Sequence, residues 1–74
     1  MWGMNIAQLA TFVAVIETGS LTSAAQRTDV TQSGVTRQMQ RLEAELGVAL
    51  LERLPTGVRP TPEGERLLAF ARDS

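Results

Sequence analysis

Cysteine and histidine are both absent from this sequence. Without cysteine the chain can form neither a disulfide framework nor a thiolate site, and without histidine it lacks the commonest metal ligand and acid–base catalyst. No apolar run approaches the roughly 20 residues of a membrane-spanning helix, and no signal-peptide pattern is recognisable. We therefore expect a soluble, cytoplasmic protein with no metal, no cofactor and no enzymatic activity.

Positive charge is also scarce. The net charge is −1 and the pI is about 5.2, whereas nucleic-acid-binding domains are often strongly basic. All seven basic residues are arginine, however, and none precedes Arg27. Because a planar guanidinium suits phosphate and guanine better than an ammonium group does, the chain from Arg27 to Arg59 can still provide a modest basic surface.

The chain has 74 residues, of which 43% are hydrophobic, enough for one small domain with a marginal core. The first predicted helix starts after Asn5, a favourable N-cap, and ends at Gly19, which can adopt a left-handed conformation. Its apolar residues recur at helical spacing and are expected in the core. They are Ile6, Leu9, Phe12, Val13 and Ile16.

Two more helices are predicted on either side of a tight turn at residues 29–30. The shorter one covers residues 21–28 after the N-cap Ser20. The longer one covers residues 32–46, between the N-cap Thr31 and the stop signal Gly47. It begins with small polar side chains and continues with an apolar stripe. The stripe consists of Val35, Met39, Leu42 and Leu46.

A short hairpin and a fourth helix complete the pattern. Residues 48–53 suit a strand, residues 54–57 contain the proline and glycine of a turn, and residues 58–59 can return as a second strand. Pro60 has no N–H and must lie at a strand edge or end. Thr61-Pro62-Glu63 is a strong helix start. This order predicts a mainly α, winged helix-turn-helix fold, with three helices, a two-stranded β wing and the start of a C-terminal linker helix.

Three segments together resemble the N-terminal DNA-binding domain of the LysR-type transcriptional regulators. They are MNIAQLATFVAVIETGSLTSAAQR at 4–27, VTQSGVTRQMQRLEAELGVALLER at 30–53 and GVRPTPEG at 57–64. The chain departs from the family where members commonly have Ser-Gln-Pro, since it has Thr31-Gln32-Ser33 followed by Gly34.

We accordingly divide the chain into three parts. Residues 1–4 are expected to be a leader, residues 5–61 the winged helix-turn-helix DNA-binding domain, and residues 62–74 a truncated linker or dimerisation helix. The resemblance further implies a larger effector-binding domain beyond residue 74.

The second helix of a helix-turn-helix motif lies in the major groove with its N-terminal residues on base edges. We expect this tip to consist of Gln32, Ser33, Gly34, Thr36 and Arg37. A glutamine can pair with adenine, and an arginine with guanine or a phosphate. On the outward face of the same helix, Gln38 and Arg41 are candidate DNA contacts, although Arg41 can instead pair with Glu45 four residues later.

Two other elements offer candidate contacts to the DNA backbone. Ser20, Thr22 and Ser23 begin the second helix, whose free N–H groups can receive a phosphate, and the alternative is ordinary capping. Arg53 and Arg59 flank the hairpin, which can lie along the backbone or reach the minor groove, where arginine is favoured. The alternative for both arginines is a solvated turn.

The last helix carries an apolar face that is either core or a seam with a partner helix. This face consists of Leu67, Leu68, Phe70 and Ala71. The resemblance implies that the helix pairs with its counterpart in a homodimer. We therefore predict sequence-specific binding of double-stranded DNA by a dimeric bacterial transcription regulator. Its operator would be an inverted repeat, with recognition helices roughly 34 Å apart or a multiple of that distance.

Two alternatives remain at this point. A winged-helix module used only for protein–protein contact would also have this pattern, and the acidic pI favours it. Among DNA-binding proteins, a MarR-like or molybdate-regulator-like winged helix has a similar order of elements.

Overall fold

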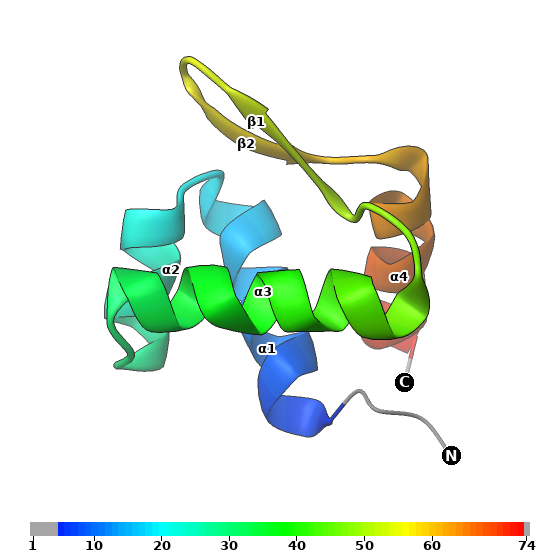
Figure 1. Cartoon of the computed structure of the whole chain (residues 1–74), viewed down its shortest axis with the longest axis horizontal. Coiled ribbons are helices and arrows are strands. Elements are labelled where there is room, and N and C mark those ends of the chain that lie inside the picture. Colours follow the sequence, from blue (N-terminus) through cyan, green and yellow to red (C-terminus); the bar gives the residue numbers. More distant parts are fainter. Residues whose placement is uncertain (1–4, 74) are drawn as a thin grey trace.

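The computed structural model describes residues 5–73, and Figure 1 shows the order of their elements. These elements are α1 (Ile6–Thr18), α2 (Leu21–Thr28), α3 (Gln32–Leu46), β1 (Leu51–Leu54), β2 (Gly57–Pro60) and α4 (Pro62–Asp73). The predicted order of three helices, a hairpin and a helix is confirmed. None of the helices between residues 5 and 73 is long and apolar enough to cross a membrane.

The helix ends follow the sequence signals. Asn5 and Gln8 form a capping box at α1, in which the Asn5 side chain accepts from the Gln8 N–H at 2.8 Å and the Gln8 side chain accepts from the Asn5 N–H at 3.0 Å. Ser20 caps α2 and Thr31 caps α3 through their hydroxyls. The chain leaves α2 through Asp29 in the left-handed conformation, at φ 59°. This reversal places α3 across α2 in the manner of a helix-turn-helix.

The core prediction for α1 is wrong in part. Ile6 is 86% exposed, and the buried face of the helix is instead centred on Phe12 and Val15, with Gln8 and Thr11 beside them. Two polar residues can occupy this face because both are hydrogen-bonded. Gln8 belongs to the capping box, and the Thr11 hydroxyl donates to the Ala7 carbonyl at 2.9 Å. Three predicted residues of the stripe are half-buried at its flank: Leu9, Val13 and Ile16.

The stripe predicted on α3 is confirmed, since Val35, Met39 and Leu42 are buried and Leu46 is half-buried against the core.

The first strand starts at Leu51 rather than at residue 48. The residues before it form a connection whose Leu50 side chain is buried in the core. Its backbone is held from α3, because one oxygen of the Glu43 carboxylate accepts the N–H of Leu50 at 2.7 Å and of Leu51 at 3.0 Å.

The hairpin is antiparallel, with Leu51 paired to Pro60 and Leu54 to Gly57. Pro60 lies at the end of β2, as its missing N–H requires. The wing is also bonded to the turn between α1 and α2, because the Val58 N–H donates to the Gly19 carbonyl at 3.0 Å. Gly57 has φ +150°, and a Cβ atom there would lie only 2.5 Å from the same carbonyl oxygen. Glycine therefore lets the wing approach the helix-turn-helix motif.

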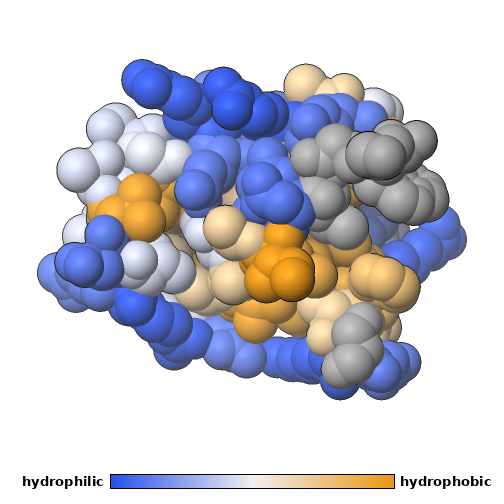
Figure 2. Space-filling model, turned by 90° about the horizontal axis from the view of Figure 1, so that it is seen from below, coloured by the Kyte–Doolittle hydropathy of each residue, from blue (hydrophilic) through white to orange (hydrophobic). Residues whose placement is uncertain are grey.

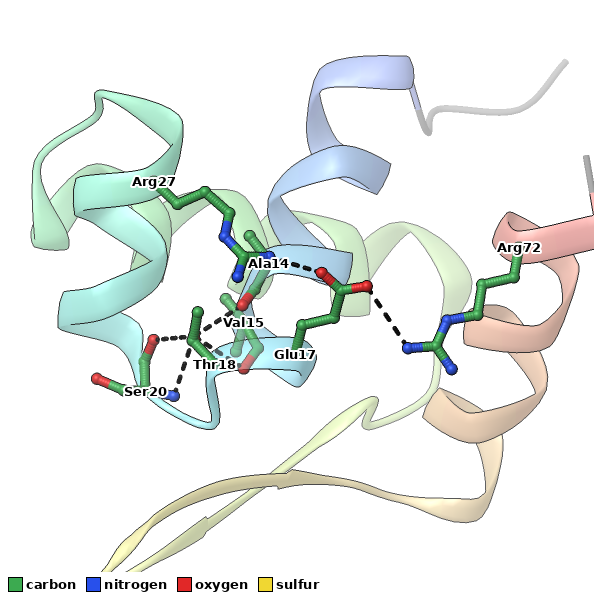
Figure 3. Close-up of polar contacts among 7 residues, drawn as sticks. All are labelled: Ala14, Val15, Glu17, Thr18, Ser20, Arg27 and Arg72. Atoms are coloured by element: carbon green, nitrogen blue, oxygen red, sulfur yellow. Dashed lines mark hydrogen bonds and ion pairs between the residues drawn. The ribbon is translucent and has the colours of Figure 1, made fainter.

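Ionic contacts join three of the helices near the end of α1 (Figure 3). One oxygen of Glu17 lies 2.6 Å from Arg27 of α2, and the other lies 3.5 Å from Arg72 of α4. Beside them, the Thr18 hydroxyl lies 2.7 Å from the Ala14 carbonyl oxygen and accepts from the Ser20 N–H at 3.3 Å. Glu17 thus links both α2 and α4 to α1.

Candidate nucleic-acid interface

The first turns of α3 present a row of polar side chains to solvent. An open groove along the helix is lined by Gln32, Ser33, Thr36, Arg37 and Gln40. Val35, Met39 and Leu42 of the same helix are buried in the core. The expectation that the polar end of this helix projects outward while its apolar flank anchors it is confirmed.

Gln40 is a groove residue that we did not predict from the sequence. It is exposed and lies four residues after Thr36 and three after Arg37, on the same face of α3. This spacing is the sequence signal that could have identified Gln40, because it extends the polar tip by about one helical turn. The base-reading tip predicted from the sequence ends at Arg37.

A second groove runs between the wing and the starts of α2 and α3. Its lining includes the N-cap Ser20, Thr22 of α2, Gln32 of α3, and Arg53 and Gly57 of the wing. Figure 1 shows the wing extending over the side of the molecule on which α2 and α3 begin. The structure therefore brings predicted DNA-contacting residues from three separate elements to a common surface. They include Thr22 of α2, Gln32 of α3 and Arg53 of the wing.

The hydroxyl groups of Ser20, Thr22 and Thr31 have different hydrogen-bond partners. The Ser20 hydroxyl accepts the Ser23 N–H at 3.1 Å, so it acts as the cap of α2. The Thr22 hydroxyl donates to Oε1 of Gln32 at 3.2 Å. Thr31 caps α3 by accepting the Gly34 N–H at 3.0 Å, and its hydroxyl lies 3.3 Å from that of Ser33.

The arginines predicted to contact DNA differ in their ionic partners. Arg37, Arg41 and Arg53 are exposed and form no ion pair with any residue between 5 and 73. The alternative pairing of Arg41 with Glu45 is not formed among residues 5–73, and the Glu45 carboxylate instead accepts from the Gln8 amide at 3.4 Å. All three guanidinium groups are therefore available to an anion.

Arg59 is exposed but already paired. Its Nε lies 2.7 Å from the carboxylate of Glu52, which is its cross-strand neighbour in the hairpin register. The hydrogen bond and charge of Glu52 raise the pKa of Arg59 above its ordinary value. The guanidinium thus remains charged, and the carboxylate of Glu52 offsets its positive charge.

Two other predicted residues, Gly34 and Gln38, lie on the flank of α3 that faces the start of α1. They share a small pocket with Asn5 and Gln8, and Arg37 and Arg41 also line this pocket. Gln38 is half-buried rather than turned outward, and its Oε1 has no hydrogen-bond partner within the described part of the chain. A Cβ atom at Gly34 would lie 2.8 Å from Cγ1 of Val30. The structure therefore places Gly34 and Gln38 beside the groove of Gln32 and Arg37, not in it.

The family described as bacterial regulatory helix-turn-helix protein, lysR family, matches residues 6–65 of this chain. The chain belongs to the LysR family.

Individual relatives agree with this assignment. The chain is 51% identical over 69 residues to the probable HTH-type transcriptional regulator LrrA of Synechococcus elongatus, and 49% identical over 69 residues to the HTH-type transcriptional regulator TcbR of Pseudomonas sp. strain P51. Both alignments cover 93% of this chain but 24% of the relative. The chain therefore spans about a quarter of the length of the curated relatives that it matches.

Two similar solved structures contain DNA. The complex of the CbnR DNA-binding domain with DNA matches at a TM-score of 0.89 and 48% identity, over 95% of this chain and 80% of that chain. The complex of the BenM DNA-binding domain with benA site 1 DNA matches at a TM-score of 0.89 and 43% identity, over 95% of this chain and 79% of that chain.

The last helix of this LysR-family domain has two kinds of apolar residue. Leu67 and Leu68 are half-buried and pack against the core, and Ala71 is also half-buried. Phe70, in contrast, is 59% exposed. Of the two possibilities for this face, the core is confirmed in part, because Leu67 and Leu68 pack against it, whereas Phe70 is largely exposed to solvent.

Proposed function

We propose that this chain binds double-stranded DNA in a sequence-specific manner, as the DNA-binding domain of a bacterial transcription regulator. The tip of α3 reads the major groove through Gln32, Ser33, Thr36 and Arg37, and Gln40 extends this contact. The start of α2 and the wing arginine Arg53 hold the phosphate backbone or reach the minor groove.

One observation carries the proposal: residues from α2, α3 and the wing, distant in sequence, line two adjoining open grooves. These grooves contain hydrogen-bond donors and acceptors for base edges together with the unpaired guanidinium groups of Arg37 and Arg53. The similar CbnR and BenM domains have been solved in complex with DNA, which supports DNA binding by this domain. Because the net charge is −1, we expect each subunit to contact few phosphates and one domain alone to bind with moderate affinity.

Dimerisation is the second part of the proposal. α4 would act as the linker helix and pair with its counterpart in a second copy, so that two recognition helices match an inverted repeat. The exposed Phe70 supports this role, as does the exposed Ile6 at the start of α1. Figure 2 shows hydrophobic residues gathered in the middle of the face seen from below, with hydrophilic residues around them. In a LysR-type regulator an effector-binding domain would follow this helix.

The decisive experiment is selection of bound duplexes from a random pool, followed by gel shifts over a salt series. The wild-type chain is expected to enrich related half-sites and to lose affinity steeply as salt rises. Arg37→Ala should lower affinity for the selected site by about 1–3 kcal/mol, the worth of a good base contact. Arg66→Ala is the matched control, since Arg66 is an exposed arginine of α4. Absent or salt-insensitive binding would instead support a protein–protein module.

Dimerisation is tested by sedimentation of the free chain and of its complex with the selected DNA. Phe70→Glu should shift the chain towards monomer and reduce the preference for two half-sites over one. Ala69→Glu places the same charge on the neighbouring exposed residue of α4 and controls for the charge itself. Equal effects of both substitutions would contradict the assignment of the dimer face to Phe70.

A further inference from the structure

The start of α1 and the middle of α3 enclose a small pocket, although α1 contains no residue that the sequence predicts as a DNA contact. The pocket is lined by Ala7 of α1 together with Arg37 and Arg41 of α3. With a volume of about 140 Å³, it is smaller and more enclosed than the two grooves of the proposed DNA-binding surface. Because Arg37 also lines the groove along α3, the pocket continues that surface onto the flank of the helix.

The pocket has positive charge that the domain itself leaves unbalanced. Arg37 and Arg41 lie four residues apart on α3, a spacing at which like charges face each other and destabilise a helix. Neither guanidinium forms an ion pair within residues 5–73, and no carboxylate of these residues lines the pocket. A bound anion would offset the repulsion between the two arginines.

The first turn of α1 adds hydrogen-bond donors at the same place. The capping box uses the N–H groups of Asn5 and Gln8. The N–H groups of Ile6 and Ala7 therefore remain without a helical acceptor. Ala7 is exposed and has a small side chain, so its backbone is accessible from the pocket. Free N–H groups at the start of a helix favour a phosphate, and the two arginines supply the opposite charge that it needs.

The pocket and the wing lie on opposite sides of α3 (Figure 1). Gln32 lines both the groove along α3 and the groove beneath the wing, whereas Arg37 lines both the groove along α3 and the pocket. The three hollows therefore follow one another across the helix, with the base-reading groove in the middle. A helix in the major groove has a phosphate backbone on each side of it. The positions of Arg53 on one flank and Arg41 on the other match this pattern.

We infer that this pocket binds a phosphate of the DNA backbone, on the side of the major groove opposite to the phosphate held by Arg53. Arg41 is the main ligand, and the first turn of α1 forms the other wall. This inference rests on the proposed function and deepens it, because it brings α1 into the DNA-binding surface and assigns Arg41 to the backbone rather than to a base.

Neutralising single phosphates tests the contact directly. Duplexes of the selected sequence each contain one methylphosphonate, which removes the charge of one phosphate, and gel shifts compare the wild type with Arg41→Gln. One methylphosphonate beside the recognition helix should lower wild-type affinity by roughly 3- to 30-fold, between the effect of an exposed ion pair and that of a hydrogen bond to a charged group. Arg41→Gln should lose a similar factor on the unmodified duplex and should be insensitive to that methylphosphonate. Arg53→Ala should become insensitive at a phosphate of the other strand instead.

A charge on α1 tests the other wall of the pocket. Ala7→Glu places a carboxylate where it competes with the phosphate for Arg37 and Arg41, so it should weaken binding and lower the salt slope by about 0.9. Ala69→Glu makes the same substitution at an exposed alanine of α4 and should leave binding to a single half-site unchanged. In an Arg41→Gln background, Ala7→Glu should cost less than in the wild type, because the shared phosphate contact is already lost. An acidic residue in the first turn suits a helix, and circular dichroism will show that the variants are folded.

Three results would overturn the inference without affecting the proposed function. One is an Arg41→Gln variant that keeps the wild-type sensitivity to every methylphosphonate. Another is a loss in Arg41→Gln that is confined to one base pair, which would assign Arg41 to a base. The third is an equal effect of Ala7→Glu and Ala69→Glu on half-site binding. Failure of the wild-type chain to bind DNA would overturn the proposed function itself.

Discussion

Gly34 and Gly64 form a natural matched pair for testing how α4 is attached to the domain. Each is the third residue of its helix, and each donates its N–H at 3.0 Å to the hydroxyl of the threonine that caps that helix. They differ in what an added methyl group would meet. At Gly34 the neighbours are ends of side chains, Cγ1 of Val30 and Oγ1 of Thr31. At Gly64 the nearest neighbour is the backbone carbonyl oxygen of Leu50.

The expected destabilisation by Gly64→Ala follows from these contacts. A Cβ atom at Gly64 would overlap the Leu50 carbonyl oxygen and lie 3.2 Å from Cβ of Pro60, so α4 must move away. Overpacking of this kind costs about 1–3 kcal/mol. The movement also weakens the bond from the Thr61 N–H to the Leu50 carbonyl, now 3.0 Å, which contributes about 1 kcal/mol. The higher helix propensity of alanine returns up to about 1 kcal/mol. The net loss is about 1–3 kcal/mol.

Thermal and urea unfolding followed by circular dichroism will measure both variants. Gly64→Ala should lower the melting temperature by roughly 5–20 °C, since 1 kcal/mol corresponds to about 4–8 °C in a domain of this size. Gly34→Ala should change stability by less than about 1 kcal/mol, because a side-chain methyl can yield and the propensity gain offsets the contact. Equal stability of the two variants, or a Gly64→Ala variant as stable as the wild type, would refute the reasoning.

Three further predictions concern the wing and its support. Arg53→Ala should weaken DNA binding evenly across sequences and reduce the salt slope by about one counterion, measured by gel shift; a loss confined to one sequence would show a base contact instead. Glu52→Gln should have the opposite sign, with tighter binding and a steeper salt slope, because it releases Arg59 from its ion pair; an Arg59→Ala background should abolish this gain. Glu43→Ala should reduce the free energy of unfolding by about 2–4 kcal/mol, since two backbone N–H groups lose one charged acceptor. Glu43→Gln retains an acceptor oxygen and should lose less, and equal losses would show that the carboxylate acts by charge rather than by hydrogen bonding.

Local signals in the sequence were sufficient for the order of the elements and the ends of the first three helices. Asn5, Ser20 and Thr31 cap their helices as expected, and the glycines at 19 and 47 end two of them in the left-handed conformation. These features depend on the chemistry of residues only a few positions apart, so they can be identified without knowing the packing. The polar tip and buried stripe of α3 were predictable for the same reason, because helical periodicity alone places them on opposite faces.

Features decided by long-range packing could not be derived in this way. Two faces of α1 were compatible with helical spacing, and contact with the other helices selected the one that carries Gln8 and Thr11 over the one that begins at Ile6. Gln38 is half-buried on the flank of α3 that faces α1, and this has the same cause. Periodicity gives the relative positions of side chains on one helix, but the neighbouring helices decide which positions face the core.

The sequence by itself determined the helices, the wing, their order and most of the residues at the tip of α3, because each depends on short-range hydrogen bonds and spacing. Only the tertiary structure decided which of these residues share a surface. It joined Thr22 to Gln32, paired Arg59 with Glu52 while leaving Arg53 unpaired, and brought the backbone of α4 onto the Leu50 carbonyl. These contacts connect different helices and strands, and their geometry exists only after the elements have packed.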